Sequence, residues 1–257
     1  MNIVTDIEAW QVIRNNLGNK TIGFVPTMGN LHEGHLQLCQ RAKRENEVAI
    51  ISIFINPTQF NEQQDFATYP RTIEQDAKLL SDHQIDYLFA PEVNQMYPDQ
   101  YEIQVTETMI SRELEGAHRP GHFNGMLTVV LKLLNLIKAT RAYFGEKDYQ
   151  QWLLVKKMVT ALFISTDIIA CETVRASDQL AFSSRNQRLN PTQRETAAYF
   201  PKILKQTETI EKIIATLQSH GFKVDYIAEK WGRRLGAVWL DDVRLIDNIS
   251  TTPQLTD

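Results

Sequence analysis

Short apolar runs alternate with amphipathic segments through the first two thirds of the chain. The run Thr21–Val25 predicts a short strand that ends at a Pro-Thr-Met-Gly turn, and Val48–Ile55 is a continuous apolar run rich in β-branched residues. A run of this kind is typical of a strand that is buried on both faces of a parallel sheet. Between the two runs, Leu31, Leu38 and Ala42 recur at helical spacing, which predicts a helix.

The alternation continues as far as residue 174. Strands are predicted at Tyr87–Ala90, Arg141–Phe144 and Asp167–Val174, and helices at Thr72–His83, Leu127–Ala139 and Tyr149–Leu162. Strands that alternate with helices of this length predict right-handed βαβ crossovers, and therefore an α/β fold with a Rossmann-like, doubly wound parallel sheet. Ligands bind at the carboxyl ends of such strands, so we expect the site in three segments that follow strand ends. These segments are Pro26–His35, Ile55–Phe60 and Phe144–Asp148.

The pattern changes after residue 174. A polar loop is followed by two helical stretches near Thr192–Gln218, and then by short apolar runs at Ala237–Leu240 and Val243–Ile246. We therefore predict two domains. Residues 1–173 form the larger, Rossmann-like domain, and residues 174–257 form a smaller α+β domain.

Composition and charge narrow the class of protein. The chain has 257 residues with 27 Lys+Arg against 31 Asp+Glu, which gives a formal net charge of −4. This balance argues against a general nucleic-acid binder but leaves a local basic pocket open. The longest apolar runs are well short of the roughly 20 residues that span a bilayer, so no membrane partner is expected. The N-terminus does not resemble a secretory signal, and Cys39 and Cys171 match no disulfide or metal-binding pattern, which favours the cytoplasm.

The most informative segment is PTMGNLHEGHLQL, where a strand end and a glycine turn lead to His32 and His35. A spacing of three residues places both imidazoles on one face of a helix, in its first turn. Unpaired backbone N–H groups and the helix dipole attract anions there, and two imidazoles can also donate to phosphate oxygens. The segment therefore predicts an anion site.

Three other interpretations of this segment compete with the anion site. Two of them are weaker than it, and the third is equally well supported. Gly29 and Gly34 have the spacing of a P-loop, but His35 stands where lysine is needed and no Ser or Thr follows. His32 and His35 form HExH rather than the HExxH of zinc proteases. On this segment alone, two histidines on a solvated first turn remain an equal alternative.

The chain resembles a known enzyme family in several motifs. His32-x-Gly34-His35 is similar to the HIGH-type signature of class I aminoacyl-tRNA synthetases and nucleotidylyltransferases, and Ser183-Ser184-Arg185-Asn186 resembles their KMSKS-type loop. On its own, the second motif fits a serine-rich surface turn better. Further segments resemble the pantothenate synthetase family, in order through almost the whole chain. They are Ser52–Phe60, Thr68–Thr72, Leu114–Gly125, Phe144–Gln151, Val174–Asn186 and Arg244–Asn248.

The resemblance implies a two-step reaction in pantothenate biosynthesis, on the coenzyme A pathway. ATP, with Mg²⁺, activates (R)-pantoate as pantoyl adenylate and releases pyrophosphate, and β-alanine then displaces AMP to give pantothenate. The small domain would act as a lid over ATP, and a homodimer is expected. Two alternatives stay open: a related nucleotidyltransferase that releases an adenylated or cytidylylated product, and a non-catalytic nucleotide-binding module.

The resemblance also implies residue roles. The ATP contacts are Met28, Gly29, Asn30, Leu31, His32, Glu33, Gly34, His35, Gly145, Glu146, Lys147, Asp148, Val174, Phe182, Ser183, Ser184 and Arg185. The catalytic groups among them are His35, His32, Lys147 and Arg185, with His35 as proton donor to the departing group. Gln59 would bind pantoate and β-alanine, and Gln151 would bind pantoate. Arg119 would steer an anionic substrate, and Asp76 would bind Mg²⁺, although a solvated helix position suits Asp76 almost as well.

Two further positions carry expectations. Cys39 lies four residues after His35, but an adenylate route needs no covalent enzyme intermediate, so we interpret Cys39 as part of an apolar helix face. Gln179 stands where the family usually has glycine. Because glycine tolerates a positive φ that glutamine does not, we expect Gln179 to stiffen this loop.

Overall fold

The computed structural model describes residues 1–61 and 66–251 of the chain. Contacts between residues group the chain into two compact units. The first consists of Met1–Glu146 and Gln150–Cys171, and the second of Lys147–Tyr149 and Glu172–Asp257. Lys147–Tyr149 therefore belongs with the C-terminal part of the chain, although it immediately follows a strand of the first unit.

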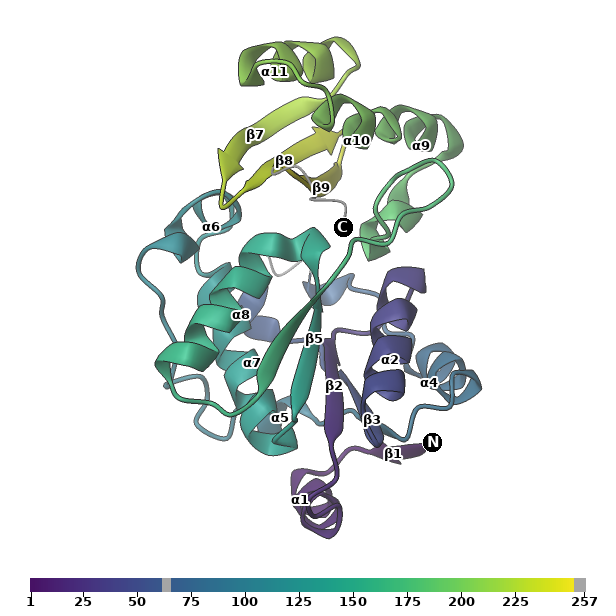
Figure 1. Cartoon of the computed structure of the whole chain (residues 1–257), viewed down its shortest axis with the longest axis vertical. Helices are drawn as coiled ribbons and strands as arrows, with labels where there is room; N and C mark the ends of the chain where they lie inside the picture. The colour runs from purple at the N-terminus through teal and green to yellow at the C-terminus, as the bar shows by residue number, and fades with distance from the viewer. Residues whose placement is uncertain (62–65, 252–257) are drawn as a thin grey trace, which may run out of the picture. The chain divides into compact units, whose positions relative to one another are not determined.

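The first unit contains a six-stranded sheet whose strands are all parallel. Along the sheet the order is β1 (Asn2–Val4), β4 (Tyr87–Phe89), β3 (Val48–Ile53), β2 (Ile22–Thr27), β5 (Arg141–Gly145) and β6 (Asp167–Cys171). The chain crosses from one side of β2 to the other between β4 and β5 (Figure 1). This crossing confirms the predicted doubly wound parallel sheet and makes the carboxyl end of β2 the topological switch point, where such folds bind ligands.

The helices of the first unit are α1 (Ile7–Asn16), α2 (Glu33–Glu45), α4 (Ile73–Asp82), α5 (Val93–Met96), α6 (Glu115–His118), α7 (His122–Ile137) and α8 (Tyr149–Ala161), with 3-10 turns η1 (Pro57–Gln59), η2 (Ile110–Arg112) and η3 (Glu146–Asp148). They lie close to the predicted positions for α2, α4, α7 and α8, whereas α1, α5 and α6 have no predicted counterpart. Helix α7 begins five residues before the predicted start, at His122. Gly121 precedes it with φ +82°, and the polar first turn lay outside the apolar pattern used to predict the helix.

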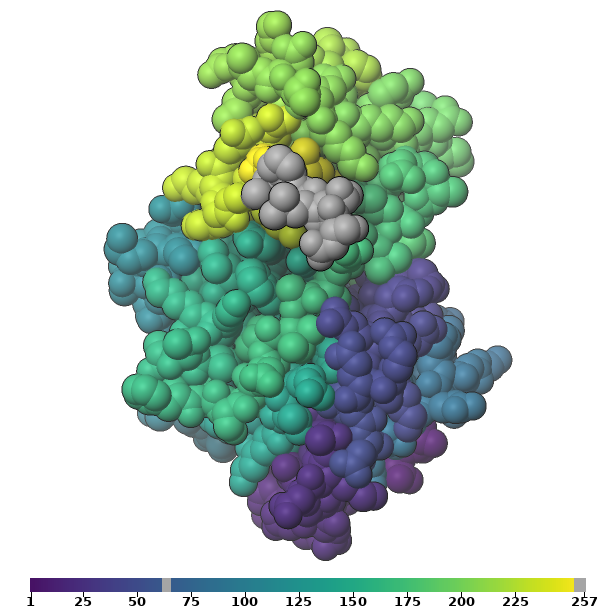
Figure 2. All heavy atoms as spheres, viewed as in Figure 1, coloured from purple at the N-terminus to yellow at the C-terminus, as the bar shows by residue number. Residues whose placement is uncertain are grey.

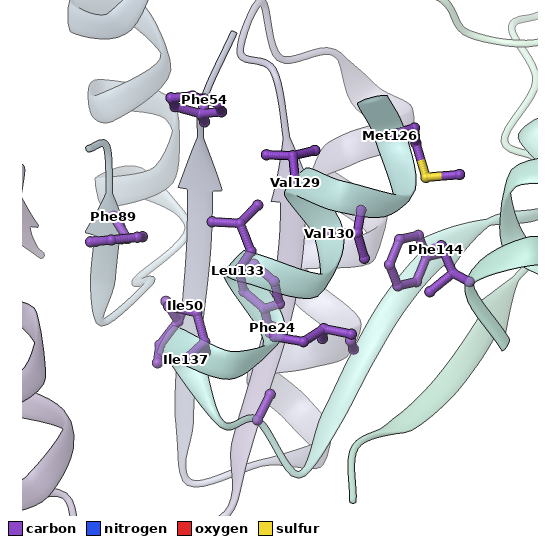
Figure 3. Packing of buried hydrophobic residues seen from close by; sticks show 14 of the residues in the cluster. Phe24, Ile50, Phe54, Phe89, Met126, Val129, Val130, Leu133, Ile137 and Phe144 are labelled. Carbon is purple, nitrogen blue, oxygen red and sulfur yellow. The ribbon is translucent and has the colours of Figure 1, made fainter. Parts of the chain in front are cut away.

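Side chains of the central strands alternate between two apolar cores. Phe24 and Ile50 face the core that includes α7, whereas their neighbours Val25 and Ile51 face the core that includes α2. All four side chains are completely buried. Figure 3 shows Leu133 of α7 packed beside Phe24 and Ile50. Burial on both faces explains why β3 appears in the sequence as one continuous apolar run.

Strand β1 has no counterpart among the predicted elements. It is a three-residue edge strand that pairs only with β4, and Ile3 is 55% exposed. The space-filling view places this N-terminal segment on the surface of the first unit (Figure 2), and Val12 of α1 is similarly exposed. A short strand with one buried residue leaves no apolar pattern that can be detected in the sequence.

The second unit has its own antiparallel sheet, β7 (Lys223–Lys230), β8 (Arg233–Leu240) and β9 (Val243–Ser250). Its helices are η4 (Ser184–Arg188), α9 (Pro191–Ala197), α10 (Tyr199–Leu204) and α11 (Ile210–Ser219). The two predicted helical stretches are thus three α-helices, with a polar break before α11, where Thr209 caps the new helix. Strand β7 was not predicted because Ile227 is its one buried residue, which leaves no alternating apolar pattern in the sequence.

None of the helices in the described residues is long and apolar enough to cross a bilayer.

Candidate active site

Two stacked histidines lie beyond the carboxyl end of β2. After Thr27 the chain turns through Gly29 (φ +81°) and Asn30 (φ +50°), and α2 then begins with His32 as its N-cap. The backbone N–H of His35 donates to the carbonyl of His32 at 2.8 Å. The two imidazole rings are stacked, with centroids 4.0 Å apart and planes inclined by 21°. The helix N-terminus therefore presents two imidazoles as one group.

The turn before these histidines is held by Asp76 of α4. The Asp76 carboxylate is 2% exposed and accepts hydrogen bonds from the backbone N–H of Asn30 and of Leu31, both at 2.9 Å. It also accepts a hydrogen bond from the Thr72 hydroxyl at 3.0 Å. A carboxylate has about four lone-pair positions, and this one uses three of them within the protein. Asp76 is therefore not the solvated helix residue that was the alternative expectation, and little of its accepting capacity is left for a metal ion.

Gln59 lies at the end of η1, just after β3, and is 8% exposed. Its amide nitrogen contacts the Met28 sulfur at 3.1 Å, and its amide oxygen accepts a hydrogen bond from Asn56 at 3.1 Å. Gln59 and Met28 come from turns that follow the adjacent strands β3 and β2. The sheet therefore brings together two residues that the resemblance assigned to substrates.

Asn56 fixes Gln59 and was not recognised in the sequence as a site residue. It is completely buried. Its oxygen accepts hydrogen bonds from the Tyr97 hydroxyl at 2.7 Å and from the Thr58 hydroxyl at 3.1 Å, and its nitrogen also donates to the Gly125 carbonyl. Burial raises the pKa of Tyr97, which keeps its hydroxyl a neutral donor. The sequence signal that could have identified Asn56 is its position, because it is an amide side chain between a buried strand and Pro57.

His122 connects Arg119 to Gln59. The Nδ1 atom of His122 lies 2.8 Å from the carbonyl oxygen of Gln59, and its Nε2 atom lies 3.0 Å from Nη1 of Arg119. A carbonyl can only accept and a guanidinium can only donate, so we assign the proton to Nδ1 and the acceptor role to Nε2. Arg119 also lies 4.0 Å from the Glu115 carboxylate. Arg119 was predicted from the sequence as a site residue and stays a prediction, whereas His122 was not predicted.

The two adjacent glutamines of α8 differ in their surroundings. Gln150 is 3% exposed, and its amide donates to the carbonyls of Ile110 and Glu113 and accepts from the backbone N–H of Glu115. Gln151, the predicted pantoate ligand, is only partly buried. Of the pair, the structure thus gives Gln150 a structural role and leaves Gln151 more accessible to a ligand.

The remaining predicted residues of the first unit lie at the ends of β5 and α2. Gly145 is the last residue of β5, which pairs with β2, and Glu146 follows it. Gly34 is partly buried within α2, whereas Glu33 is exposed and accepts a hydrogen bond from Gln37 at 2.9 Å. Glu33 therefore points its carboxylate to the surface of α2.

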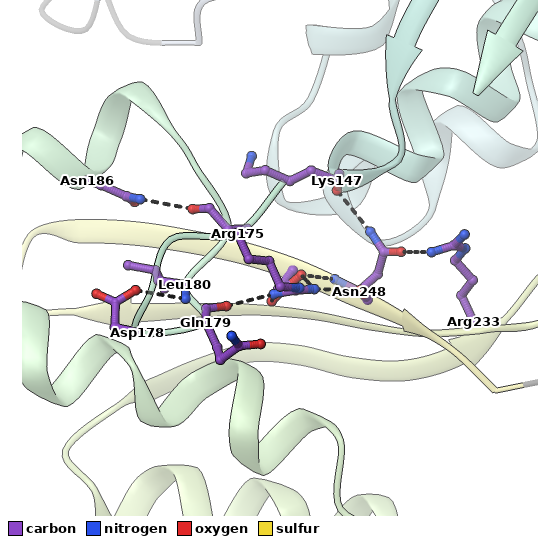
Figure 4. Close-up of polar contacts among 10 residues, drawn as sticks. Lys147, Arg175, Asp178, Gln179, Leu180, Asn186, Arg233 and Asn248 are labelled. Carbon is purple, nitrogen blue, oxygen red and sulfur yellow. Dashed lines mark hydrogen bonds and ion pairs between the residues drawn. The ribbon is translucent and has the colours of Figure 1, made fainter. Parts of the chain in front are cut away.

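Lys147 lies within the second unit, together with Asp148. The Lys147 ammonium is 3.5 Å from the Asp148 carboxylate, and the Lys147 side chain is 15% exposed against 47% for Asp148. The Lys147 carbonyl accepts a hydrogen bond from Asn248 at 3.0 Å (Figure 4). The Lys147 side chain is therefore mostly buried, and a hydrogen bond holds its backbone in place.

The loop that carries the KMSKS-like motif is closed by backbone hydrogen bonds. The N–H of Phe182 donates to the carbonyl of Val174 at 3.1 Å, so the two predicted nucleotide contacts are paired with each other. Ser183 caps η4 by accepting from the N–H of Arg185, which is itself exposed, and Ser184 is the first residue of η4.

Gln179 forms the tip of this loop with φ +73°, and its carbonyl accepts a hydrogen bond from Arg175. This backbone conformation confirms that the position suits glycine.

Cys39 is completely buried on the inner face of α2. Desolvation raises the pKa of its thiol to about 12, so the thiol is neutral near pH 7. A neutral, inaccessible thiol cannot act as a nucleophile. The residues described in the structure also contain no group of three or more His, Cys, Asp or Glu that is placed to hold a metal ion.

A doubly wound parallel sheet that carries paired histidines at a helix N-terminus beside its switch point is typical of α/β nucleotide-binding enzymes. Comparison with known proteins identifies the family within this class. The chain belongs to the pantoate-beta-alanine ligase family, whose model matches residues 2–250.

Relatives in this family resemble the chain over nearly its whole length. Pantothenate synthetase of Legionella pneumophila (strain Corby) is 49% identical over 96% of this chain and 99% of the relative. The crystal structure of pantoate-beta-alanine ligase from Francisella tularensis, complexed with beta-gamma ATP and beta-alanine, has a TM-score of 0.93 at 45% identity and covers 98% of both chains. A crystal structure of pantothenate synthetase from Thermus thermophilus has a TM-score of 0.89 at 38% identity, covering 98% of this chain and 100% of that one.

Proposed function

We propose that the chain catalyses the ATP-dependent condensation of (R)-pantoate with β-alanine, giving pantothenate, AMP and pyrophosphate through pantoyl adenylate. The observation that carries this proposal is the stacked pair of His32 and His35 at the N-terminus of α2, beyond the strand β2 that neighbours both β3 and β5. Family membership and the ligands named for the Francisella tularensis structure support the same reaction.

In the first step a pantoate carboxylate oxygen attacks the α-phosphorus of ATP, and the bond to the β-phosphate oxygen breaks. Negative charge grows on the α-phosphate and on the departing pyrophosphate. Backbone N–H groups and imidazoles at the start of α2 are suited to stabilise that charge. We assign to His35 the proton that goes to the departing group, and to His32 a hydrogen bond to the phosphate.

Amide groups are suited to hold pantoate, because they orient a carboxylate without removing its charge. Gln59 is held rigidly by Asn56 and Met28, so its position is fixed before any substrate binds. We propose that Gln59 and Gln151 bind pantoate and that Gln59 also contacts β-alanine. Arg119, fixed through His122, would attract the anionic substrates.

The triphosphate requires cations and hydroxyl donors. We propose Lys147, Arg185, Ser183 and Ser184 for this role, and residues 174–257 as a lid domain that excludes water from the mixed anhydride. The N-terminal residues 1–173 would then form the domain that binds substrate and ATP.

Mg²⁺ usually keeps several waters and is held by substrate phosphates with one or two carboxylates. Asp76 fits that role poorly, because three of its lone pairs are already used in the protein. We therefore propose that Mg²⁺ enters with ATP, and we assign it no protein ligand. A cytoplasmic location and a homodimer complete the proposal.

A pyrophosphate-exchange assay tests the reaction. Exchange of labelled pyrophosphate into ATP should require pantoate, and addition of β-alanine should then release AMP and form an amide. Exchange that proceeds without pantoate, or an adenylate that β-alanine never discharges, would contradict the proposal. The second result would instead identify a nucleotidyltransferase.

A further inference from the structure

The segment Arg244–Asn248 is one of the motifs that resemble the family, but the sequence analysis assigned it no role. It lies on β9, and its last two residues, Asp247 and Asn248, are each 3% exposed. Buried polar side chains are almost always hydrogen-bonded, so their partners show what they hold in place. Besides the neighbouring strand β8, these partners come from two segments that are remote in sequence from β9.

Asn248 holds the backbone of Lys147. Its amide nitrogen donates to the Lys147 carbonyl at 3.0 Å, and its amide oxygen accepts from Nη1 of Arg233 at 2.8 Å (Figure 4). Because a guanidinium only donates and a carbonyl only accepts, these two partners determine which way the amide faces. The Arg233 guanidinium also lies 4.5 Å from the centre of the Tyr149 ring. The segment Lys147–Tyr149 is thus contacted at both ends by β8 and β9.

Asp247 holds the start of the KMSKS-like loop. Its two carboxylate oxygens accept hydrogen bonds from Arg175 at 2.6 Å and 2.9 Å, and Arg175 also donates to the Gln179 carbonyl at 3.1 Å. A two-point ion pair between a partly buried guanidinium and a buried carboxylate fixes geometry strongly, because the buried carboxylate would be costly to leave unpaired. Arg175 begins the loop that leads to Ser183 and Arg185.

We infer that Asn248 is a positioning residue that fixes Lys147 within the C-terminal unit, at a constant position relative to the Ser183–Arg185 loop. Adjacent residues of one strand, Asp247 and Asn248, hold the two segments that bear the proposed triphosphate cations. Lys147 would therefore accompany the C-terminal unit in any closure, although its nearest strand in sequence, β5, belongs to the first unit. This inference rests on the proposed function, in which Lys147 binds the triphosphate.

The substitution Asn248→Asp provides the test. It keeps the oxygen that faces Arg233 but replaces the donor with an oxygen that faces the Lys147 carbonyl. In the exchange assay we expect KM for ATP to rise and kcat for adenylation to fall, each by about tenfold. Discharge of preformed pantoyl adenylate by β-alanine should be unchanged, because no triphosphate takes part in that step. A merely structural role would slow both steps alike and would overturn the inference.

A double-mutant cycle sharpens the result. In a Lys147→Ala background, Asn248→Asp should have almost no further effect on adenylation, because it acts through the Lys147 side chain. Independent, multiplicative losses would overturn the inference. Trp239→Phe is the matched control, since it removes a hydrogen bond to Asp225 in the same sheet without contacting Lys147.

A second variant tests the same inference if the Asn248→Asp chain does not fold. Arg233→Gln removes the anchor of the Asn248 amide from a partly exposed position, and we expect a smaller loss that is again confined to adenylation. Normal adenylation by a folded Arg233→Gln chain would count against the inference. If the wild-type chain shows no pantoate-dependent exchange, the proposed function itself fails, which is a distinguishable outcome.

Discussion

The Asp76 carboxylate and the backbone N–H of Leu31 are joined by a hydrogen bond of 2.9 Å, although 45 residues separate them in sequence. The same carboxylate accepts from Asn30, which has φ +50°. Two consecutive backbone N–H groups that point at one carboxylate define the path of the turn. Asp76 therefore determines where α2 begins, and with it the positions of His32 and His35.

The first prediction concerns this carboxylate. Asp76→Ala leaves two buried N–H groups without their acceptor, which should cost about 3 kcal/mol of unfolding free energy. The rate of adenylation should fall by more than tenfold, because the histidines lose their fixed position. Urea unfolding and pyrophosphate exchange measure the two effects. Glu74→Gln, an exposed carboxylate of the same helix, is the control and should change neither. A fully stable Asp76→Ala chain would contradict this role.

The second prediction concerns the contact between α7 and η1. A Cβ atom on Gly125 would lie 2.4 Å from the Thr58 carbonyl oxygen and 2.7 Å from the Gln59 nitrogen. Gly125→Ala should therefore displace η1, destabilise the fold by about 1–3 kcal/mol and raise KM for pantoate more than KM for ATP.

Steady-state kinetics and thermal unfolding of Gly125→Ala can be compared with those of Asn135→Ala, on the exposed face of the same helix. Equal rises in both KM values for Gly125→Ala would show that Gln59 does not depend on this contact.

The third prediction concerns the histidine pair. His35→Ala should lower the rate of adenylation by about a hundredfold or more, because it removes a proton donor and a phosphate contact. Discharge of preformed adenylate by β-alanine should be affected far less. Gln37→Ala, on an exposed position of the same helix, should leave both steps intact. Unchanged exchange by His35→Ala would show that the residue has been misassigned.

Local patterns made part of this site predictable. His32 is the extended N-cap of α2 and His35 lies in its first turn, so a spacing of three residues across the start of a helix brings the two rings together. The buried run of β3 located the turn that carries Gln59, because a parallel strand places its carboxyl end at the ligand edge of the sheet. These inferences use only neighbouring residues and the chirality rules of parallel sheets.

Long-range partners could not be predicted in the same way. The Tyr97 hydroxyl reaches Asn56 across 41 residues, and His122 reaches the Gln59 carbonyl across 63. No periodicity in the sequence records such pairs, because the first depends on where the end of α5 lies and the second on the packing of α7 against η1. The placement of Lys147 with the C-terminal unit depends likewise on Asn248, 101 residues away.

The fourth prediction concerns the strained loop tip. Gln179 is exposed at φ +73°, where a side chain is disfavoured, and its backbone donates a hydrogen bond to Ala176 and accepts one from Arg175. Gln179→Gly should raise the unfolding free energy by about 0.5–1 kcal/mol, measured as a higher Tm. Gln218→Gly, the same change at an exposed position inside α11, should lower it by about 1 kcal/mol. Shifts of the same sign in both variants would contradict the strain argument.

The fifth prediction concerns the pH dependence of stability. Burial raises the pKa of Cys39 from its ordinary value of 9.0 to about 12. Between these two values the unfolded chain loses the thiol proton while the folded chain keeps it. The unfolded state then binds fewer protons, so stability falls as pH rises, by about 1.4 kcal/mol per pH unit for one thiol. Below pH 9 both states hold the proton, and this contribution is constant.

Cys39→Ala isolates this contribution, because every other titrating group is shared with the wild-type chain. Unfolding free energies from urea titrations at pH 8.0, 9.5 and 10.5 should converge, as the wild-type advantage shrinks while pH rises above 9. Cys171 is less buried than Cys39, and the pKa of its thiol is also raised by desolvation, so Cys171→Ala should show the same trend with a smaller total change. A constant difference between wild-type and Cys39→Ala across this range would mean that the Cys39 thiol ionises equally readily in the folded state.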